Sequence, residues 1–151
     1  MSKQEMIVQM MRDYAVKGED YFDPMPESKL KEAEALLEVN FPDSYKWYIQ
    51  NYGHGGLEGV EILGIAQIAM PVVETTIDYR QYGLPQQYIV IEDCGEYVYC
   101  LDTSRMENEE CPIINWAIWE PIPIDEFDDF YSFLIDRFQG TIDNMDDDDE
   151  L

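Results

Sequence analysis

Apolar residues recur at helical spacing in four parts of the chain. The spacing i, i+3, i+4, i+7 fits residues 4–17, 28–39 and 42–52, and it returns after Asp125. Glycine readily takes the left-handed backbone conformation that ends helices, so Gly140 is expected to end the last segment. The pattern predicts three N-terminal helices and one C-terminal helix. The apolar residues expected to face the core are Ile7, Met10, Met11, Tyr14, Leu30, Ala33, Leu36, Leu37, Tyr45, Tyr48, Ile49, Tyr52, Phe127, Phe130, Tyr131, Leu134 and Phe138.

The middle of the chain is typical of β-strands. Residues 88–93 and 96–101 are rich in β-branched and aromatic residues, and an Asp-Cys-Gly turn joins them. These two runs predict an antiparallel hairpin. Residues 60–66 and 112–117 indicate further strands, and the pattern leaves open whether residues 118–122 extend the second of these.

The order of these elements indicates an α+β fold. Residues 71–82 are ambiguous, although Pro71 and the apolar spacing after it fit a short helix that ends at Gly83. Helices come first, strands follow, and a helix closes the chain, which is typical of an antiparallel twisted sheet packed by N-terminal helices and a C-terminal helix. With 151 residues and no internal repeat, we expect one domain over residues 1–142. The like charges of residues 143–151 predict a disordered acidic tail.

Charge narrows the range of partners. The net charge is −24 at pH 7, from 33 acidic and nine basic residues. Residues 47–151 hold 23 of these acids and only three bases, all of them arginines. Such a surface repels nucleic acid and anionic membranes, whereas it attracts a basic protein and speeds the encounter with it. The alternative is that the charge only keeps the protein soluble.

The residues that most catalytic and metal sites require are scarce. His54 is the only histidine and lies in a glycine-rich turn, a poor platform for a general base. The odd number of cysteines (Cys94, Cys100 and Cys111) without a Cys-x-x-Cys motif indicates reduced thiols. Residues 146–150 lack the spacing and glycine of a calcium loop. We therefore expect no enzyme, cofactor or metal site, with a carboxylate-based hydrolase that uses a divalent ion as an alternative.

The sequence also bears on location. No apolar run approaches the roughly 20 residues that span a bilayer. The first residues lack the basic start and apolar stretch of a signal peptide. We expect a cytoplasmic protein.

Several motifs also carry a family resemblance. Residues 30–39 alternate glutamates with apolar residues, Phe41-Pro42 leads into the aromatic helix, and Asn51–Gly56 forms a glycine-rich turn. Later runs are Ile-Val-Ile-Glu-Asp, Tyr-Val-Tyr-Cys-Leu-Asp-Thr, Cys-Pro-Ile-Ile-Asn-Trp and the segment 127–138. In order and spacing these motifs resemble the SUKH superfamily, the Smi/Knr-type fold, and are most similar to its YobK-like branch. The resemblance covers about residues 28 to 138.

The resemblance implies a function. Bacterial SUKH proteins are mostly immunity proteins (antitoxins) that bind and neutralise a polymorphic toxin. In the YobK-like branch, the partner is typically the C-terminal nuclease domain of an LXG-type toxin. The family has no shared catalytic residues to carry over. Fungal relatives act in cell-wall regulation and signalling, so a non-enzymatic scaffold is the alternative.

These considerations together predict a contact surface. A nuclease must bind phosphate, so its active site is basic, and an acidic protein can cover it by stoichiometric occlusion. We expect the contact to use acids in or beside the loops that follow strands, with Trp119 as an anchor. Packing of Trp119 and Pro121 against the last helix is the alternative. The expected toxin-binding residues are Glu92, Asp93, Glu96, Asp102, Glu107, Glu109, Glu110, Trp119 and Glu120.

Overall fold

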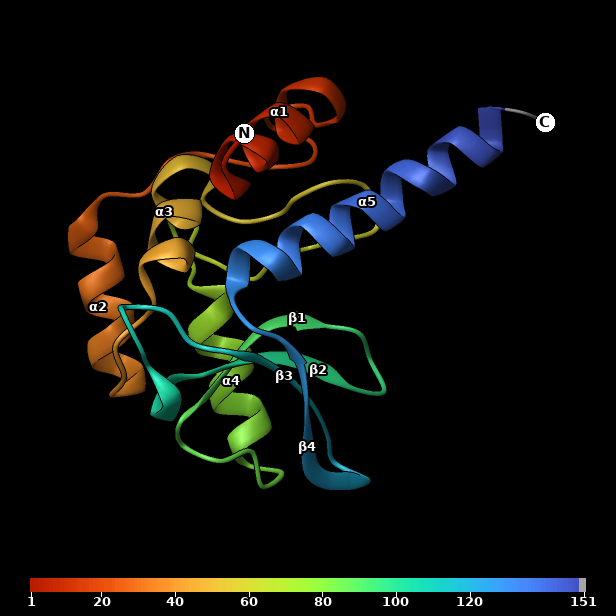
Figure 1. Cartoon of the computed structure of the whole chain (residues 1–151). Helices are drawn as coiled ribbons and strands as arrows, with labels where there is room; N and C mark the ends of the chain where they lie inside the picture. Colours follow the sequence, from red (N-terminus) through yellow and green to blue (C-terminus); the bar gives the residue numbers. More distant parts are fainter. Residues whose placement is uncertain (150–151) are drawn as a thin grey trace.

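The computed structural model describes residues 1–149, which fold into five α-helices and one four-stranded antiparallel sheet (Figure 1). The helices are α1 (Lys3–Tyr14), α2 (Glu27–Leu37), α3 (Asp43–Tyr52), α4 (Pro71–Arg80) and α5 (Phe130–Asp149). The strands are β1 (Tyr88–Asp93), β2 (Val98–Asp102), β3 (Ile113–Ala117) and β4 (Glu120–Phe127), with a short 3₁₀ helix η1 (Thr103–Arg105) after β2. The predicted single α+β domain is confirmed.

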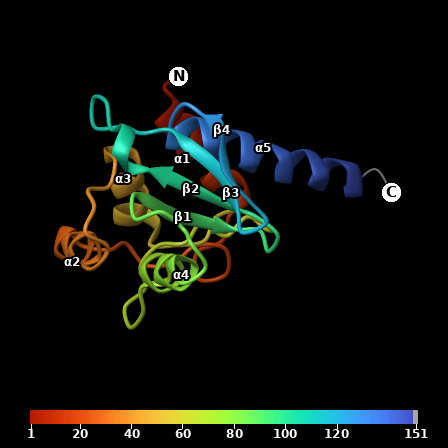
Figure 2. The ribbon, with the colours of Figure 1, turned by 90° about the horizontal axis from the view of Figure 1, so that it is seen from below.

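The sheet has the order β1-β2-β3-β4, so each strand pairs with its neighbour in sequence. The predicted hairpin is β1–β2, with a register shift between Val90 and Glu92. Helix α4 lies on one face of the sheet, and α1 and α5 lie on the other (Figure 2). Both faces are therefore covered near β1, which explains why five consecutive residues of that strand are buried.

Two hydrophobic clusters lie on opposite sides of the sheet. The larger cluster joins the N-terminal helices and α5 to the inward residues of the sheet, among them Ile89 and Leu101. The smaller one packs around Val90 and Trp116. The aromatic face predicted for α3 is confirmed, whereas Tyr14 of α1 and Leu36 of α2 are exposed and were predicted wrongly.

The buried tyrosines of α3 keep their hydroxyl groups satisfied. Tyr45 Oη donates to the carbonyl of Leu63 at 2.7 Å, and Tyr48 Oη donates to the carbonyl of Gly55 at 2.8 Å. Burial raises the pKa of both phenols well above the usual value. These two bonds tie the irregular segment after α3 to the core.

The largest departure from the sequence prediction is β4. The apolar spacing predicted that the last helix begins near Asp125, but residues 120–127 form an edge strand and α5 begins at Phe130. Asp129 caps this helix, because its carboxylate accepts a hydrogen bond from the Ser132 N–H at 2.8 Å. Pro121 and Pro123 obscured the strand in the sequence, since proline is tolerated in sheets mainly on edge strands.

Residues 60–66, predicted as a strand, are instead a loop. Ile62 forms only an isolated bridge with Gly55. Val60, Ile62 and Ile65 are nevertheless buried in the larger cluster. The alternation of apolar residues therefore reflects a loop that packs on the core, and the strand prediction was wrong.

Helix α5 runs through Gly140, which was predicted to end it, and continues to Asp149. The acidic stretch predicted to be disordered is thus helical as far as Asp149, while residues 150–151 lie outside the described part of the chain. Ile142 is buried and Gln139 Nε2 donates to Asp143 at 2.9 Å, so the helix stays anchored beyond the glycine. Like charges in a helix cost only tenths of a kcal/mol per pair. The end of α5 projects from the body (Figure 1).

Replacing Gly140 with alanine is expected to stabilise the protein by about 0.5–1 kcal/mol, because glycine is a weak helix former and the new methyl group would meet no atom within 4 Å. Urea unfolding of the two proteins measures the change. Gly18→Ala is the control, since that position is equally open but has a φ of +90°. We expect the control to be destabilised. An equal rise in the free energy of unfolding of both variants would contradict the explanation that helix propensity stabilises Gly140→Ala.

Candidate functional site

The three basic side chains beyond residue 46 are all engaged within the fold. Each is an arginine whose guanidinium donates hydrogen bonds to carboxylates or carbonyl oxygens. The bonded partners are Glu92 for Arg137, Asp102 and Asp125 for Arg105, and the carbonyls of Leu37 and Gln86 for Arg80. Most exposed acids of the sheet and its connections therefore have no basic neighbour to neutralise them, and the surface field is strongly negative.

Glu92 belongs to a buried ion pair. Its carboxylate accepts two hydrogen bonds from Arg137 of α5, at 2.8 Å from Nε and 2.6 Å from Nη2. The Arg137 guanidinium also lies 5.6 Å from the centre of the Tyr99 ring. The bonds to Glu92 raise the pKa of Arg137. Because only 5% of the Glu92 side chain is exposed, this acid joins β1 to α5 and is not available to a partner.

Asp102 and Glu110 also have roles within the fold. Asp102 is buried, caps η1 through the Ser104 N–H, and accepts a bond from Arg105 Nε at 2.7 Å. Glu110 accepts hydrogen bonds from the N–H and the hydroxyl of Ser44 at the start of α3. Partial burial raises the pKa of Glu110. Both acids therefore hold loops in place, and their predicted contact with a toxin stays a prediction.

The other predicted contact residues lie at two opposite ends of the sheet. Asp93 and Glu96 flank the β1–β2 turn, Trp119 lies in the β3–β4 turn, and Glu120 follows it as the first residue of β4. In an antiparallel sheet of this order, those two turns share one end. Glu107 and Glu109 lie in the β2–β3 connection, at the other end (Figure 1). Trp119 is 85% exposed and so does not pack against the last helix.

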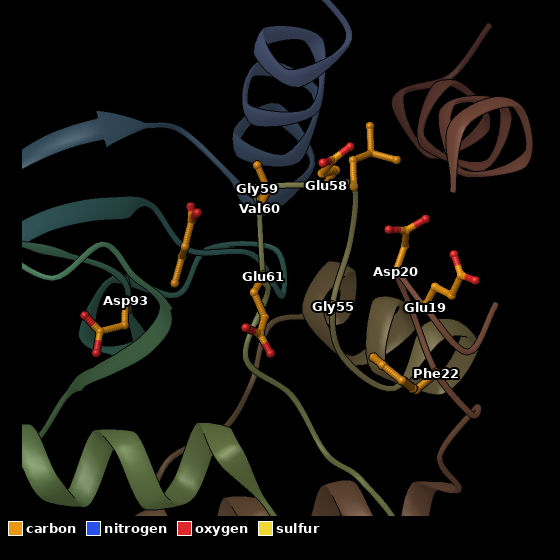
Figure 3. A pocket seen from close by; sticks show the side chains of 11 residues that line it. Glu19, Asp20, Phe22, Gly55, Glu58, Gly59, Val60, Glu61 and Asp93 are labelled. Atoms are coloured by element: carbon orange, nitrogen blue, oxygen red, sulfur yellow. The ribbon is translucent and has the colours of Figure 1, made fainter. Parts of the chain in front are cut away.

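An acidic hollow lies beside the end of the sheet that carries the β1–β2 turn (Figure 3). It has a volume of about 460 Å³, and three segments that are distant in sequence line it. None of its lining residues is a lysine or an arginine. The exposed or half-buried acids around it are Glu19, Asp20, Glu58, Glu61 and Asp93. Figure 3 shows Glu19 and Asp20 on the side opposite Asp93, with Glu61 between them.

Sequence reasoning missed four of these acids because backbone contacts bring their loops together. The Gly56 N–H donates to the carbonyl of Asp20 at 2.7 Å, and Gly55 forms bridges to both Tyr21 and Ile62. Gly55 has a φ of +93° and no room for a side chain. The two adjacent glycines were the signal that two backbones meet here.

The remaining reactive groups do not assemble into a centre. The His54 ring stacks on Phe22 with centroids 4.3 Å apart, and burial lowers its pKa. The three cysteines are free, and Cys100 and Cys111 are buried. Among residues 1–120 and 122–145, whose side chains the structure describes, no three His, Cys, Asp or Glu side chains are placed to hold a metal ion. A separate observation is that no helix within residues 1–149 is long and apolar enough to cross a membrane.

Comparison with known proteins identifies a family and a similar solved structure. A family model, SUKH_5, described as SMI1-KNR4 cell-wall, matches residues 4–139. Among solved structures, a protein from Pseudomonas syringae pv. tomato is similar, with a TM-score of 0.61 and 19% sequence identity. The alignment covers 76% of this chain and 83% of the other. At this identity the solved structure supports the fold alone.

Proposed function

The chain belongs to the SUKH family of the SMI1-KNR4 type, and from this we propose that it is an immunity protein that binds and neutralises a basic toxin in the cytoplasm. SUKH domains are generally non-catalytic immunity or scaffold proteins. The observation that carries the proposal is the uncompensated negative surface. The net charge is −24, and all three arginines beyond residue 46 are engaged within the fold.

The partner that suits this surface is a nuclease. A nuclease holds a polyanion, so its active site presents lysine and arginine, and the exposed acids of this chain can occupy the same positive field. We propose the C-terminal nuclease domain of an LXG-type toxin, on the resemblance to the YobK-like branch. Inhibition then needs only equimolar occlusion, and electrostatic steering makes the association fast.

Co-expression with the C-terminal domain of the toxin encoded beside this chain tests the proposal. We expect growth rescue, an equimolar complex on co-purification and an association rate that falls as salt rises. No complex and no rescue would overturn the immunity function and favour the scaffold role.

Charge reversal tests the contribution of the acids. The triple variant Asp93→Lys, Glu96→Lys and Glu120→Lys changes exposed acids at one end of the sheet. We expect association with the toxin domain to slow roughly tenfold or more, measured by stopped-flow fluorescence. The matched control reverses Asp13, Glu74 and Asp78, which are exposed on α1 and α4 and, like the test residues, form no ion pair among the described residues. Equal slowing in both triples would show that only total charge matters.

A further inference from the structure

An apolar patch is exposed at the β3–β4 hairpin. We call it the hairpin patch, and it comprises Ile118, Trp119, Ile122 and Ile124. Trp119 is 85% exposed and Ile122 is 83% exposed. Single exposed apolar residues are common, but four between positions 118 and 124 are not explained by chance exposure. The hairpin extends beyond the helices that cover the rest of the sheet (Figure 1).

The backbone of β4 is poorly suited to pairing with another strand. Two of its residues, Pro121 and Pro123, have no N–H to donate. Its pairing with β3 also shifts register at two places. One shift lies between Ile113 and Ile114 of β3, and the other lies between Asn115 and Ala117. Prolines and bulges are the devices by which proteins protect sheet edges. A partner of the hairpin patch is therefore expected to meet its side chains, and not to extend the sheet.

The charge around the hairpin patch indicates what kind of partner covers it. Glu120 lies within the hairpin patch, is exposed and makes no ion pair within the described part of the chain. Toward the far end of β4, Glu126 and Asp128 are also exposed and have no ion pair among the described residues. Arg105, also at that end, donates two bonds to Asp125 and lowers the pKa of that carboxyl. An apolar centre with an acidic rim complements an apolar recess bordered by lysine and arginine.

The same charge disfavours two other occupants. A second copy of this chain would bring a second net charge of −24 and would place two acidic surfaces against each other. An anionic membrane would meet the same repulsion. Tryptophan is also the residue most enriched at the energetic centres of protein interfaces.

We propose that the hairpin patch is the anchor of the toxin interface, with Trp119 and Ile122 inserted into an apolar recess of a basic protein and the surrounding acids paired at its rim. This inference deepens the proposed function and rests on it. The β1–β2 turn and the acidic hollow lie at the same end of the sheet as the β3–β4 turn, so one partner can contact all three.

The test compares two identical substitutions at exposed isoleucines. Ile122→Ala lies in the hairpin patch, whereas Ile68→Ala lies in the loop before α4, where Ile68 is 99% exposed. Trp119→Ala is the third variant. Binding to the toxin domain is measured by calorimetry at high salt, where charge steering is screened. We expect Kd to rise about 30-fold or more for Trp119→Ala, about tenfold for Ile122→Ala and not measurably for Ile68→Ala.

The outcomes separate this inference from the proposed function. A wild-type protein that does not bind the toxin domain would overturn both. Tight binding by all three variants would overturn the anchor and leave the immunity function standing. Sedimentation of the wild-type protein alone tests whether a second copy covers the hairpin patch. A dimer that dissociates in the Trp119→Ala variant would show that it does and would refute the basic partner. Unchanged thermal unfolding of each variant confirms that the exposed substitutions act on binding.

Discussion

Replacing Arg137 with methionine is expected to lower the free energy of unfolding by about 3–5 kcal/mol, because it leaves a buried carboxylate without its partner. Glu92 has 5% of its side chain exposed and receives both of its hydrogen bonds from this arginine. Methionine replaces the aliphatic part of the arginine side chain and removes the guanidinium, so the loss mainly reports the lost charge and its hydrogen bonds. Urea unfolding followed by circular dichroism measures it.

Two further variants make this prediction specific. Lys31→Met removes an exposed partner of Glu27, and we expect a change within about 0.5 kcal/mol. The double variant Glu92→Gln with Arg137→Met removes both charges and is expected to recover a large part of the lost stability, since the cost of a broken buried pair is mostly that of the remaining charge. A loss below about 1 kcal/mol in Arg137→Met would mean that water or a rearranged side chain already compensates Glu92.

Replacing Gly55 with alanine is expected to cost at least about 3 kcal/mol and to open the acidic hollow. The positive φ of +93° costs an L-residue about 1–2 kcal/mol. The added methyl group would also collide with the carbonyl oxygen of Asp20, which is backbone and cannot swing away. The loops that carry Glu19 and Glu58 must then separate.

Gly59→Ala is the matched control for this effect. Its φ of +86° carries the same backbone cost, but a methyl group there would meet no atom within 4 Å. We expect a loss of about 1–2 kcal/mol in the control. The difference between the two variants, again from urea unfolding, measures the close approach of the two loops. Equal losses would show that the contact with residue 20 is easily relieved.

The sequence predicted the parts of the fold in which local pattern and packing agree. The β1–β2 hairpin was found because its strands are rich in β-branched residues around a turn sequence, and α3 was found because its aromatic face is buried. Strand β4 was missed because two prolines and three acids make it resemble a loop that leads into a helix. Its pairing with β3 is local, but the pairing shifts register twice, so a regular alternation of apolar and polar residues does not mark the strand.

The candidate site was less predictable than the fold. Glu92 and Glu96 differ little in the sequence, yet one is buried beside Arg137 and the other is exposed, because α5 crosses β1 at that point. The partner of Glu92 lies 45 residues away. The loops of the acidic hollow are likewise joined through backbone contacts of two glycines, so their acids could not be grouped from spacing alone. Trp119 lies beside a single acid, Glu120, and the sequence left open whether it packs on the last helix. It is exposed, and its role in binding stays a prediction.

The separation of the two turns from both hydrophobic clusters bears on how such a protein can change. The residues at the tips of the β1–β2 and β3–β4 turns, from Gly95 to Glu96 and from Ile118 to Glu120, contribute nothing to either cluster. Substitutions in these turns therefore change the surface of the proposed interface at little cost in folding stability. Under the proposed function, binding specificity can evolve there without compensating mutations in the core.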